Sequence, residues 1–267
     1  MTTRVRLDSE LVRRGLARSR EQATELITAG HVRVNGQQAA KPATQVTRDV
    51  PIVIDGSKGK DEYVSRGGHK LAGALAKFTD LNIQGRIALD AGASTGGFTD
   101  VLLRAGAAHV TAADVGYGQL AWSLRTDPRV TVMDRVNVRE LKPDAIEPPP
   151  DLVVADLSFI SLTLVLPALV GTAKETSDFV LMVKPQFEVG KGRVGAGGVV
   201  RDTTARSDAI RTVCEAAGKL GLGVQGITAS PLPGPAGNVE YFVWLRAGAP
   251  PLDETELERA IEEGPRQ

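Results

Sequence analysis

The stretch that most constrains this chain is a short apolar segment that breaks into a glycine-rich turn at residues 87–99. Residues 87–89 (Ile-Ala-Leu) have the composition of a buried strand, and apolar side chains recur at helical spacing from Phe98 to Arg104. A strand, a glycine turn and a helix in this order open the nucleotide-binding type of α/β domain. We therefore predict an α/β fold organised around a Rossmann-like sheet.

The spacing of the glycines favours one cofactor over another. A dinucleotide site needs Gly-x-Gly-x-x-Gly to seat a pyrophosphate, whereas this turn reads Gly92-x-x-x-Gly96-Gly97. A carboxylate ahead of such a turn suits S-adenosylmethionine (SAM), whose ammonium attracts an anion, better than NAD, which stays the alternative. A second carboxylate at the end of the next strand can accept the ribose hydroxyls of an adenosine. The predicted cofactor contacts are Asp90, Gly92, Ser94, Thr95, Gly96, Gly97, Phe98 and Asp114, with Asp134 and Asn137 near the adenine.

Apolar runs bounded by turn residues predict the rest of the sheet. Helical patterns separate several of these runs, as expected for parallel strands joined by crossover helices. We expect seven strands in all, with the last one antiparallel. Besides residues 87–89, the predicted strands are 109–113, 129–133, 152–155, 179–183, 224–228 and 239–245.

The charge of the chain is unevenly distributed. The 267 residues carry no net formal charge, but residues 1–60 hold 11 Lys and Arg against six Asp and Glu. A basic segment of this kind is typical of a surface that contacts phosphates, although a solvated basic face has the same composition. Within it, Ser19 to Gln22 form a capping box that opens a helix, and short strands follow.

Residues 6–36 resemble the S4 RNA-binding domain. The pattern Arg-Leu-Asp, then Leu-Val-Arg-Arg-Gly-Leu-Ala-x-Ser-Arg, then Val-x-Val-Asn-Gly runs through this stretch almost without a break. The resemblance implies a small α+β domain that docks on folded RNA through its basic residues. The predicted RNA contacts are Arg4, Arg6, Arg14, Arg18, Arg20 and Lys41, with Arg66 in the domain that follows.

The single cysteine and the apolar runs limit the cellular setting. Cys214 alone can form neither an intrachain disulfide nor a cysteine-cluster metal site, and its helical surroundings predict a small buried side chain. Residues 1–6 lack the apolar core of a signal peptide, and the longest apolar run, 159–170, is too short for a membrane span. We expect a cytoplasmic monomer without a bound metal.

Four charged residues from distant parts of the chain are predicted to meet at one rim of the sheet. Asp156 and Lys184 follow the fourth and fifth strands. Glu240 begins the last strand, and Lys70 lies on a helix ahead of the sheet. In a doubly wound sheet these positions lie above the strand ends, where α/β sites are built. Two ammoniums and two carboxylates form a coupled network, in which a neighbouring ammonium and desolvation lower the pKa of one lysine.

A lysine of lowered pKa suits methyl transfer to a ribose hydroxyl. That hydroxyl is a weak nucleophile that must lose its proton as it attacks, and a neutral lysine can accept the proton. Methylation of a base carbon usually needs a cysteine, and Cys214 is badly placed. Amine methylation usually shows an Asn/Asp-Pro-Pro-aromatic motif, whereas residues 156–159 read Asp-Leu-Ser-Phe. A 2′-hydroxyl is the remaining acceptor, and it favours RNA over DNA.

The whole chain resembles the TlyA family, in which an S4 domain precedes an FtsJ-like methyltransferase domain. The resemblance implies that Lys70, Asp156, Lys184 and Glu240 form a Lys-Asp-Lys-Glu tetrad, and that the residue at 184 is the base. It also implies 2′-O-methylation of cytidine in 16S and 23S ribosomal RNA, and a link to capreomycin susceptibility. The matching motifs are residues 64–71 (VSRGGHKL), 90–99 (DAGASTGGFT), 114–120 (DVGYGQL), 156–161 (DLSFIS), 184–188 (KPQFE) and 237–241 (GNVEY).

The same resemblance divides the chain and leaves other functions open. It implies an S4-like domain at 1–60, a linker at 61–64 and an FtsJ-like SAM-dependent methyltransferase domain at 65–267. Tyr63 departs from some relatives, which carry tryptophan there. The family is also named for haemolysins, but a membrane-active segment does not stand out. A non-catalytic RNA-binding chaperone is a further alternative, and the expected partners are ribosomal RNA and ribosomal subunits rather than a membrane.

Overall fold

The chain folds into two compact units, Met1–Glu62 and Tyr63–Gln267. The computed structural model describes residues 4–17, 19–48, 50–54 and 63–264. The predicted linker spans the boundary between the units, and its residues 61 and 62 lie outside the described residues. Val64 belongs to the second unit, where its amide donates to Asp100 Oδ2 at 2.9 Å.

The first unit is a small α+β domain with its own core. Its elements are β1 (Arg4–Arg6), α1 (Leu7–Arg13), α2 (Arg20–Thr28), β2 (Val32–Val34), β3 (Gln37–Gln38), β4 (Gln45–Thr47) and β5 (Ile52–Ile54). Helix α2 begins as predicted, because Ser19 Oγ accepts a hydrogen bond from the amide of Gln22. Leu7, Leu11 and Ile27 are fully or almost fully buried and hold the two helices together. The sequence patterns do not predict β1, which pairs antiparallel with β4.

The second unit is built on a seven-stranded sheet. Its strands are β6 (Ile87–Ala91), β7 (His109–Asp114), β8 (Val130–Asp134), β9 (Leu152–Ala155), β10 (Asp178–Val183), β11 (Leu222–Ala229) and β12 (Tyr241–Ala247). The strand order is β11-β12-β10-β9-β6-β7-β8. β12 is antiparallel to both of its neighbours, β10 and β11, and the other pairs of neighbouring strands are parallel. The predicted Rossmann-like fold with an antiparallel last strand is therefore confirmed.

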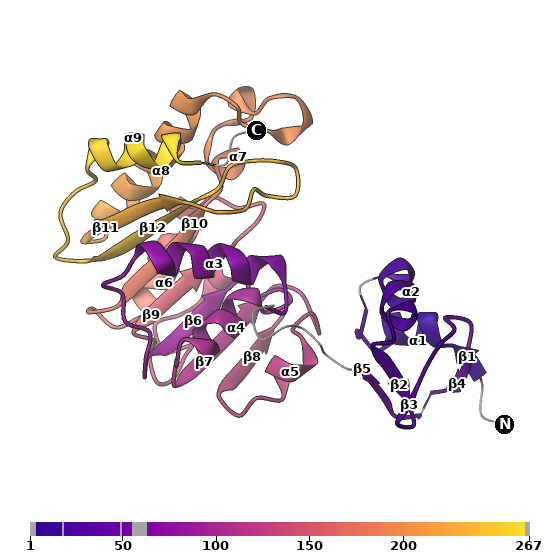
Figure 1. Cartoon of the computed structure of the whole chain (residues 1–267). Helices are drawn as coiled ribbons and strands as arrows, with labels where there is room; N and C mark the ends of the chain where they lie inside the picture. Colours follow the sequence, from indigo (N-terminus) through magenta and orange to yellow (C-terminus); the bar gives the residue numbers. More distant parts are fainter. Residues whose placement is uncertain (1–3, 18, 49, 55–62, 265–267) are drawn as a thin grey trace. The chain divides into compact units, whose positions relative to one another are not determined.

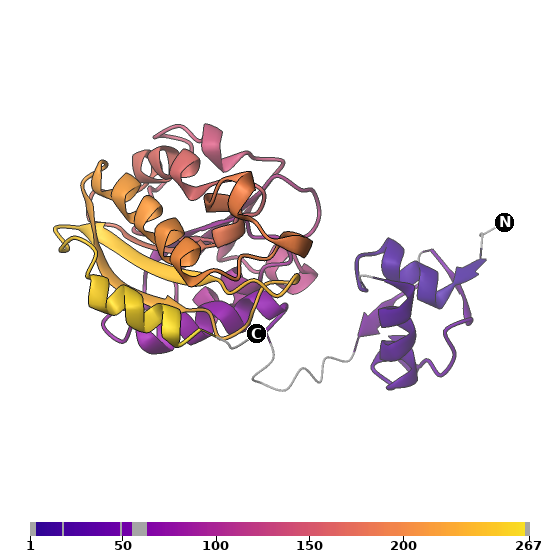
Figure 2. The ribbon, with the colours of Figure 1, turned by 90° about the horizontal axis from the view of Figure 1, so that it is seen from above.

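Helices cover both faces of this sheet. They are α3 (Arg66–Lys77), α4 (Gly97–Arg104), α5 (Trp122–Arg125), α6 (Leu162–Thr172), α7 (Pro185–Glu188), α8 (Thr203–Gly218) and α9 (Glu254–Glu262). Leu71 and Phe98 belong to the core on the α3 and α4 face, and Leu166 and Val213 to the core on the α6 and α8 face. Figure 2 shows α3 and α8 on opposite sides of the strands, and Figure 1 shows α9 beside α8. Because both faces are covered, strands such as β10 read as continuous apolar runs.

Short helical turns follow several strand ends and escape sequence-based prediction. Besides α5 and α7 they include the 3₁₀ turns η1 (Val138–Glu140), η2 (Lys191–Arg193) and η3 (Ala196–Gly198). Helix α7 begins directly after Lys184 because Pro185 suits the first position of a helix. No helix in the part of the chain that the structure describes is long and apolar enough to cross a membrane.

Candidate active site

The carboxyl edge of the sheet collects the predicted catalytic residues. The end of β9 lies beside the end of β10, so Asp156 and Lys184 leave neighbouring strands at the same edge. On the other side of β10, Tyr241 at the start of β12 lies opposite Val183. Because β12 runs in the opposite direction, Glu240 reaches this edge as well.

Lys184 is a buried lysine held by two neighbours. Its side chain is 9% exposed, and its Nζ lies 2.6 Å from Asp156 Oδ1. The same ammonium donates to Ser158 Oγ at 2.9 Å. Burial of an ammonium is costly unless a counterion and hydrogen bonds replace water, and the loop after β9 supplies both. Sequence reasoning assigned no role to Ser158, although its place two residues beyond Asp156 was a usable signal.

Lys70 and Glu240 form a second buried ion pair. The Nζ and Oε2 atoms are 2.5 Å apart, and the side chains are 9% and 1% exposed. Lys70 lies one turn beyond Arg66 on α3, but Lys70 turns inward whereas Arg66 is exposed. The four predicted catalytic residues are thus arranged as two ion pairs at one edge, and each lysine has one carboxylate partner.

Two glycines let the turn after β6 pack closely against its neighbours. One approaches the segment after β9, which carries Asp156, and the other approaches the start of α3, which carries Lys70. Gly92 has a φ of +85°, and a Cβ placed on it would lie 2.7 Å from the backbone oxygen of Asp156. A Cβ on Gly97, at the start of α4, would overlap Ser65 and Gly68 at the start of α3. A side chain at either position would push the turn away from the edge. The glycine spacing noted in the sequence therefore serves close backbone packing.

Asp90 is a fully buried carboxylate with one oxygen unused. Its Oδ2 accepts hydrogen bonds from the amide and the hydroxyl of Thr99 at 2.9 and 2.6 Å. Its Oδ1 is buried and has no hydrogen-bond partner among the described residues. Burial, reinforced by the carboxylates of Asp156 and Asp114, raises the pKa of Asp90 to about 7 against the opposing bonds from Thr99. A cation beside Oδ1 would favour the ionised form, so the position fits an ammonium ligand.

Asp114 holds the conformation of the glycine turn. Its Oδ2 accepts from the amide of Ser94 at 2.9 Å, and its Oδ1 accepts from the amide of Gly116 at 2.7 Å. Ser94 has a φ of 48°, in the left-handed region, and the bond to Asp114 helps to hold it there. Of the neighbouring predicted contacts, the Thr95 carbonyl accepts the amide of Ala121, Gly96 caps α4, and Phe98 is buried against Phe242.

Asp134 and Asn137 bond within the protein. Asp134 forms an ion pair with Arg125 at 2.9 Å. Asn137 accepts from the amide of Arg139 and donates to Glu140 Oε1. Asp134 is the last residue of β8 and lies opposite Asp114 at the end of β7, and Asn137 follows three residues later. A contact between either residue and an adenine stays a prediction.

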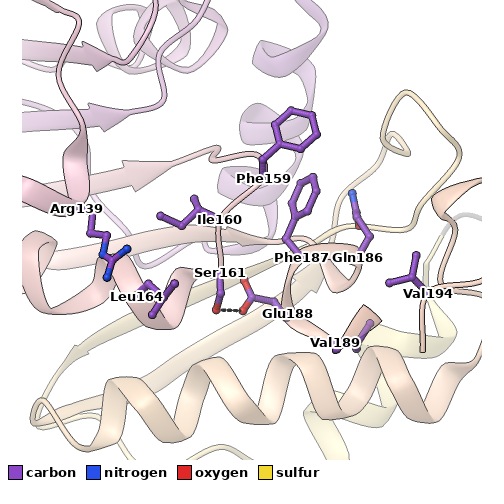
Figure 3. A pocket seen from close by; sticks show the side chains of 11 residues that line it. Arg139, Phe159, Ile160, Ser161, Leu164, Gln186, Phe187, Glu188, Val189 and Val194 are labelled. Carbon is purple, nitrogen blue, oxygen red and sulfur yellow. Dashed lines mark hydrogen bonds between the residues drawn. The ribbon is translucent and has the colours of Figure 1, made fainter. Parts of the chain in front are cut away.

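A pocket of about 590 Å³ opens where the loops after β9 and β10 meet. Figure 3 shows the rings of Phe159 and Phe187 side by side at this pocket, with their centroids 5.3 Å apart. Phe159 is 91% exposed and has a φ of +65°, a strained conformation for a bulky residue. Below the rings, Ser161 Oγ donates to Glu188 Oε2, and burial raises the pKa of Glu188. The pocket therefore pairs an exposed aromatic wall with a polar floor.

Each of the two units matches a known protein family. Residues 63–247 match the FtsJ-like methyltransferase family, and residues 5–52 match the S4 domain. A 16S/23S rRNA (cytidine-2′-O)-methyltransferase named TlyA, from Mycobacterium tuberculosis (strain ATCC 25618 / H37Rv), is 59% identical over 273 residues, which cover 99% of this chain and 100% of the relative. The chain belongs to the TlyA family. Its second unit is accordingly a methyltransferase domain, and the protein is an enzyme.

Other TlyA relatives carry two kinds of name. A 23S rRNA (cytidine-2′-O)-methyltransferase TlyA from Campylobacter jejuni subsp. jejuni (serotype O:23/36, strain 81-176) is 34% identical, over 85% of this chain and 93% of the relative. A solved structure from Streptococcus thermophilus, named as a hemolysin, is 39% identical with a TM-score of 0.72, over 98% of this chain and 96% of that one. The same family thus includes proteins named for methylation and proteins named for haemolysis.

The S4 unit places the predicted RNA contacts of this TlyA protein in different surroundings. Arg4 and Lys41 are exposed, and Arg18 lies outside the described residues. Arg6 and Arg20 both contact Asp8. Arg14 contacts Glu10 and also donates to the carbonyls of Val50 and Arg48 at 2.7 and 2.8 Å, so its hydrogen bonds join α1 to the segment before β5.

Four described arginines of the methyltransferase unit are exposed and have no carboxylate partner; one of them, Arg201, donates to the carbonyl of Ala196. The others are Arg66, Arg135 and Arg139. Arg135 instead lies over the ring of Tyr117, 4.4 Å from its centroid. By contrast, Arg104 is paired with Asp100. The described residues also hold no group of three His, Cys, Asp or Glu arranged to bind a metal ion.

Proposed function

We propose that this protein methylates the 2′-hydroxyl of cytidine in ribosomal RNA, with SAM as the methyl donor. The observation that carries the proposal is the buried ammonium of Lys184, held between Asp156 and Ser158 beside the glycine turn. A lysine in this position is fixed in space and largely shielded from water, as a general base should be. No comparable lysine is expected in a plain RNA-binding protein.

The proposed reaction is an in-line displacement. SAM, when bound, supplies a methyl carbon activated by its sulfonium. The ribose 2′-oxygen attacks this carbon, the new O–C bond forms as the S–C bond breaks, and the hydroxyl proton passes to Nζ of Lys184. Lys184 must therefore be unprotonated when the ribose arrives. Holding the reacting atoms about 3 Å apart supplies much of the rate enhancement.

The remaining charged residues position the base. Asp156 and Ser158 fix Nζ of Lys184 from one side, so its lone pair has a defined direction after proton loss. The buried pair of Lys70 and Glu240 fixes the start of α3 against the start of β12. This second pair keeps the edge rigid and holds an ammonium near the developing charge of the ribose oxygen.

The cofactor site is proposed at the glycine turn. The unused Oδ1 of Asp90 suits the ammonium of SAM, and Asp114 suits the ribose hydroxyls of its adenosine. Gly92 lets the backbone approach closely. The residues that would hold SAM thus lie at the ends of β6 and β7, and the end of β9, which Asp156 follows, lies beside the end of β6.

The surface around this edge supports RNA as the substrate. Val115, Tyr117, Trp122 and Phe159 are at least 66% exposed. Arg135 and Arg139 follow β8, whose end lies beside that of β7, and Arg66 is the first residue of α3. Exposed aromatic rings stack on unpaired bases, and free guanidiniums bind phosphates. The pocket beside Phe159 has room for a nucleotide taken out of its stack.

The names of the relatives support a choice of target nucleotide. Their names support cytidine as the target, and the 59% identical relative supports 16S and 23S RNA as joint substrates. We propose that the enzyme works as a monomer on ribosomal subunits in the cytoplasm, and that its loss alters susceptibility to capreomycin.

Methyl transfer to ribosomal subunits tests the proposal. Unmodified 30S and 50S subunits are incubated with the full-length protein and SAM labelled on the methyl group, and ribose methylation is mapped by mass spectrometry. We expect 2′-O-methylcytidine with wild-type protein and none above background with K184A. Label on a base, label that persists in K184A, or no label on either subunit would contradict it. The exposed lysine variant K174A is the matched control and should transfer normally.

A further inference from the structure

We infer that Asp8 is a positioning residue for RNA binding: its buried carboxylate holds the guanidiniums of Arg6 and Arg20 together as one preformed phosphate-binding element. This inference rests on the proposed RNA-binding function of the first unit. From its charge alone, a carboxylate is expected to repel RNA and weaken binding. We infer the opposite for Asp8, because it holds two arginines in place.

The geometry around Asp8 joins two elements of the S4 unit. Asp8 lies in α1 and is 2% exposed. Arg6, at the end of β1, donates from Nε to Oδ1 at 3.0 Å and from Nη2 to Oδ2 at 2.7 Å. Arg20, at the start of α2, donates from Nη2 to the same Oδ2 at 3.0 Å. One carboxylate therefore brings together two guanidiniums that are 14 positions apart in sequence.

The two arginines still have donors to offer. Their side chains are 45% and 58% exposed, whereas Asp8 is almost completely covered. All the hydrogen bonds that their guanidiniums make to described residues end on Asp8, so Nη1 of Arg6 and both Nε and Nη1 of Arg20 face no protein acceptor there. Two positive charges share one negative charge, and the cluster keeps a net charge of +1. A phosphate can bind the outward donors without displacing the carboxylate.

The neighbouring carboxylate shows what a purely structural cluster looks like. Glu10 is 1% exposed and also binds two arginines, Arg13 and Arg14. The Arg14 side chain is only 21% exposed, and its other donors are used by the carbonyls of Val50 and Arg48. Through Arg14, Glu10 therefore links α1 to the segment before β5 and has a structural role. Asp8 differs because both of its arginines end at the surface.

Preforming the cluster should raise affinity by lowering an entropic cost. A free arginine side chain loses rotamer freedom when it binds a phosphate, and this costs about 0.5–1.5 kcal/mol per side chain. Asp8 removes part of that cost before RNA arrives. It also offsets the mutual repulsion of two guanidiniums held side by side. The hydrogen bond from Arg6 is the main cause that lowers the pKa of Asp8, and it outweighs burial, which by itself would raise that pKa.

The test compares two substitutions that change the net charge equally. Asp8→Asn and Glu25→Gln each make the full-length protein more positive by one charge. Glu25 lies on α2 with its side chain exposed and is the matched control. Binding to fluorescently labelled ribosomal RNA is measured by anisotropy at several salt concentrations. We expect D8N to bind about tenfold more weakly than wild type, corresponding to about 1.4 kcal/mol, and E25Q to bind as tightly as wild type or slightly more tightly.

A double-variant comparison separates positioning from general damage. If Asp8 acts through its two arginines, D8N has no further effect on RNA affinity in an R6Q/R20Q background. A D8N protein that is folded by circular dichroism yet binds as tightly as wild type overturns the inference. So does a D8N effect of the same size in the R6Q/R20Q background.

Two further readouts keep the inference decidable. If D8N does not fold, side-chain ¹⁵Nε relaxation of the wild-type protein gives the answer. The Nε–H of Arg6 should then be as rigid as the backbone, and mobility equal to that of exposed Arg66 contradicts preorganisation. Methyl transfer distinguishes the two proposals. If wild-type protein and D8N both methylate RNA and bind it with equal affinity, only the role of Asp8 is refuted. Absence of RNA binding by wild type refutes both.

Discussion

The ammonium of Lys184 lies 2.6 Å from Oδ1 of Asp156, across the ends of two neighbouring parallel strands. The same ammonium donates to the hydroxyl of Ser158. An ionic and a neutral contact therefore hold one nitrogen, and they should differ in their effect on the reaction because charge-assisted bonds are the stronger kind.

We expect the graded series D156N, S158A and K184R to separate these contributions. D156N should lower kcat by about 10²-fold, and S158A by roughly 3- to 10-fold, consistent with one neutral hydrogen bond. K184R should be inactive, because arginine keeps its proton at all accessible pH values, while its charge still pairs with Asp156. Single-turnover methyl transfer at saturating SAM and RNA measures each rate. Substantial activity in K184R would rule out proton transfer to residue 184.

The buried pair of Lys70 and Glu240 predicts a large cost for removing one partner. K70M leaves a carboxylate that is 1% exposed without its counterion, so unfolding free energy should fall by about 3–5 kcal/mol. Lys77 on the same helix is exposed, and its ion pair with Glu263 is long, at 3.8 Å. Because exposed ion pairs contribute little, K77M should change the unfolding free energy by about 1 kcal/mol or less. Urea titration of both variants checks this. The double variant K70M/E240Q should recover part of the lost stability but not the activity, and equal losses in K70M and K77M would contradict the burial argument.

Asp90 predicts a pH dependence of stability. Its folded pKa of about 7 lies above the ordinary value of 3.8. Between these two pH values the folded protein binds a proton that the unfolded chain releases, so this contribution to stability is present at low pH and is lost as the pH rises through about 7. Asp90→Asn lacks the titration. The difference in unfolding free energy between D90N and ligand-free wild type should therefore increase, in favour of D90N, from about pH 5 to pH 8. If the unfolding free energies of the two proteins change in parallel with pH, residue 90 does not titrate in this range.

The left-handed backbone of Phe159 predicts opposite effects on stability and activity. F159G should relieve the strain and raise the unfolding free energy by about 0.5–1 kcal/mol relative to F159A, because glycine accepts a positive φ. Both variants should lower kcat/KM for ribosomal RNA by about tenfold, in line with the loss of one stacked base. SAM affinity, measured separately by calorimetry, should not change. A variant with full activity would exclude a stacking role for the ring.

The sheet and its edge were predictable because the information is local. Strands such as β10 are buried on both faces, so their composition alone identifies them. Residues just beyond their ends, such as Asp156 and Lys184, must then meet at the carboxyl edge. Glu240 required one further step, since only the antiparallel direction of the last strand brings its first residues to that edge.

The features that escaped prediction depend on distant partners. Strand β1 has three residues and is defined by pairing with β4. The structural role of Arg14 depends on its hydrogen bonds to the carbonyls of Val50 and Arg48, which are distant in sequence. Only its ion pair with Glu10 was predictable, because the two residues are four positions apart on a helix. Asp90 was predicted beside the cofactor, but its unused oxygen and its raised pKa follow from complete burial.

The position of β12 has a consequence for how the protein is made. This strand is the last of the seven in sequence order, yet it lies between β10 and β11, and Glu240 directly precedes its first residue. A polypeptide that stops before residue 240 has every earlier strand but lacks the acidic partner of Lys70. The proposed site can therefore be completed only after residue 240 has been synthesised, when the six earlier strands of the sheet are already available.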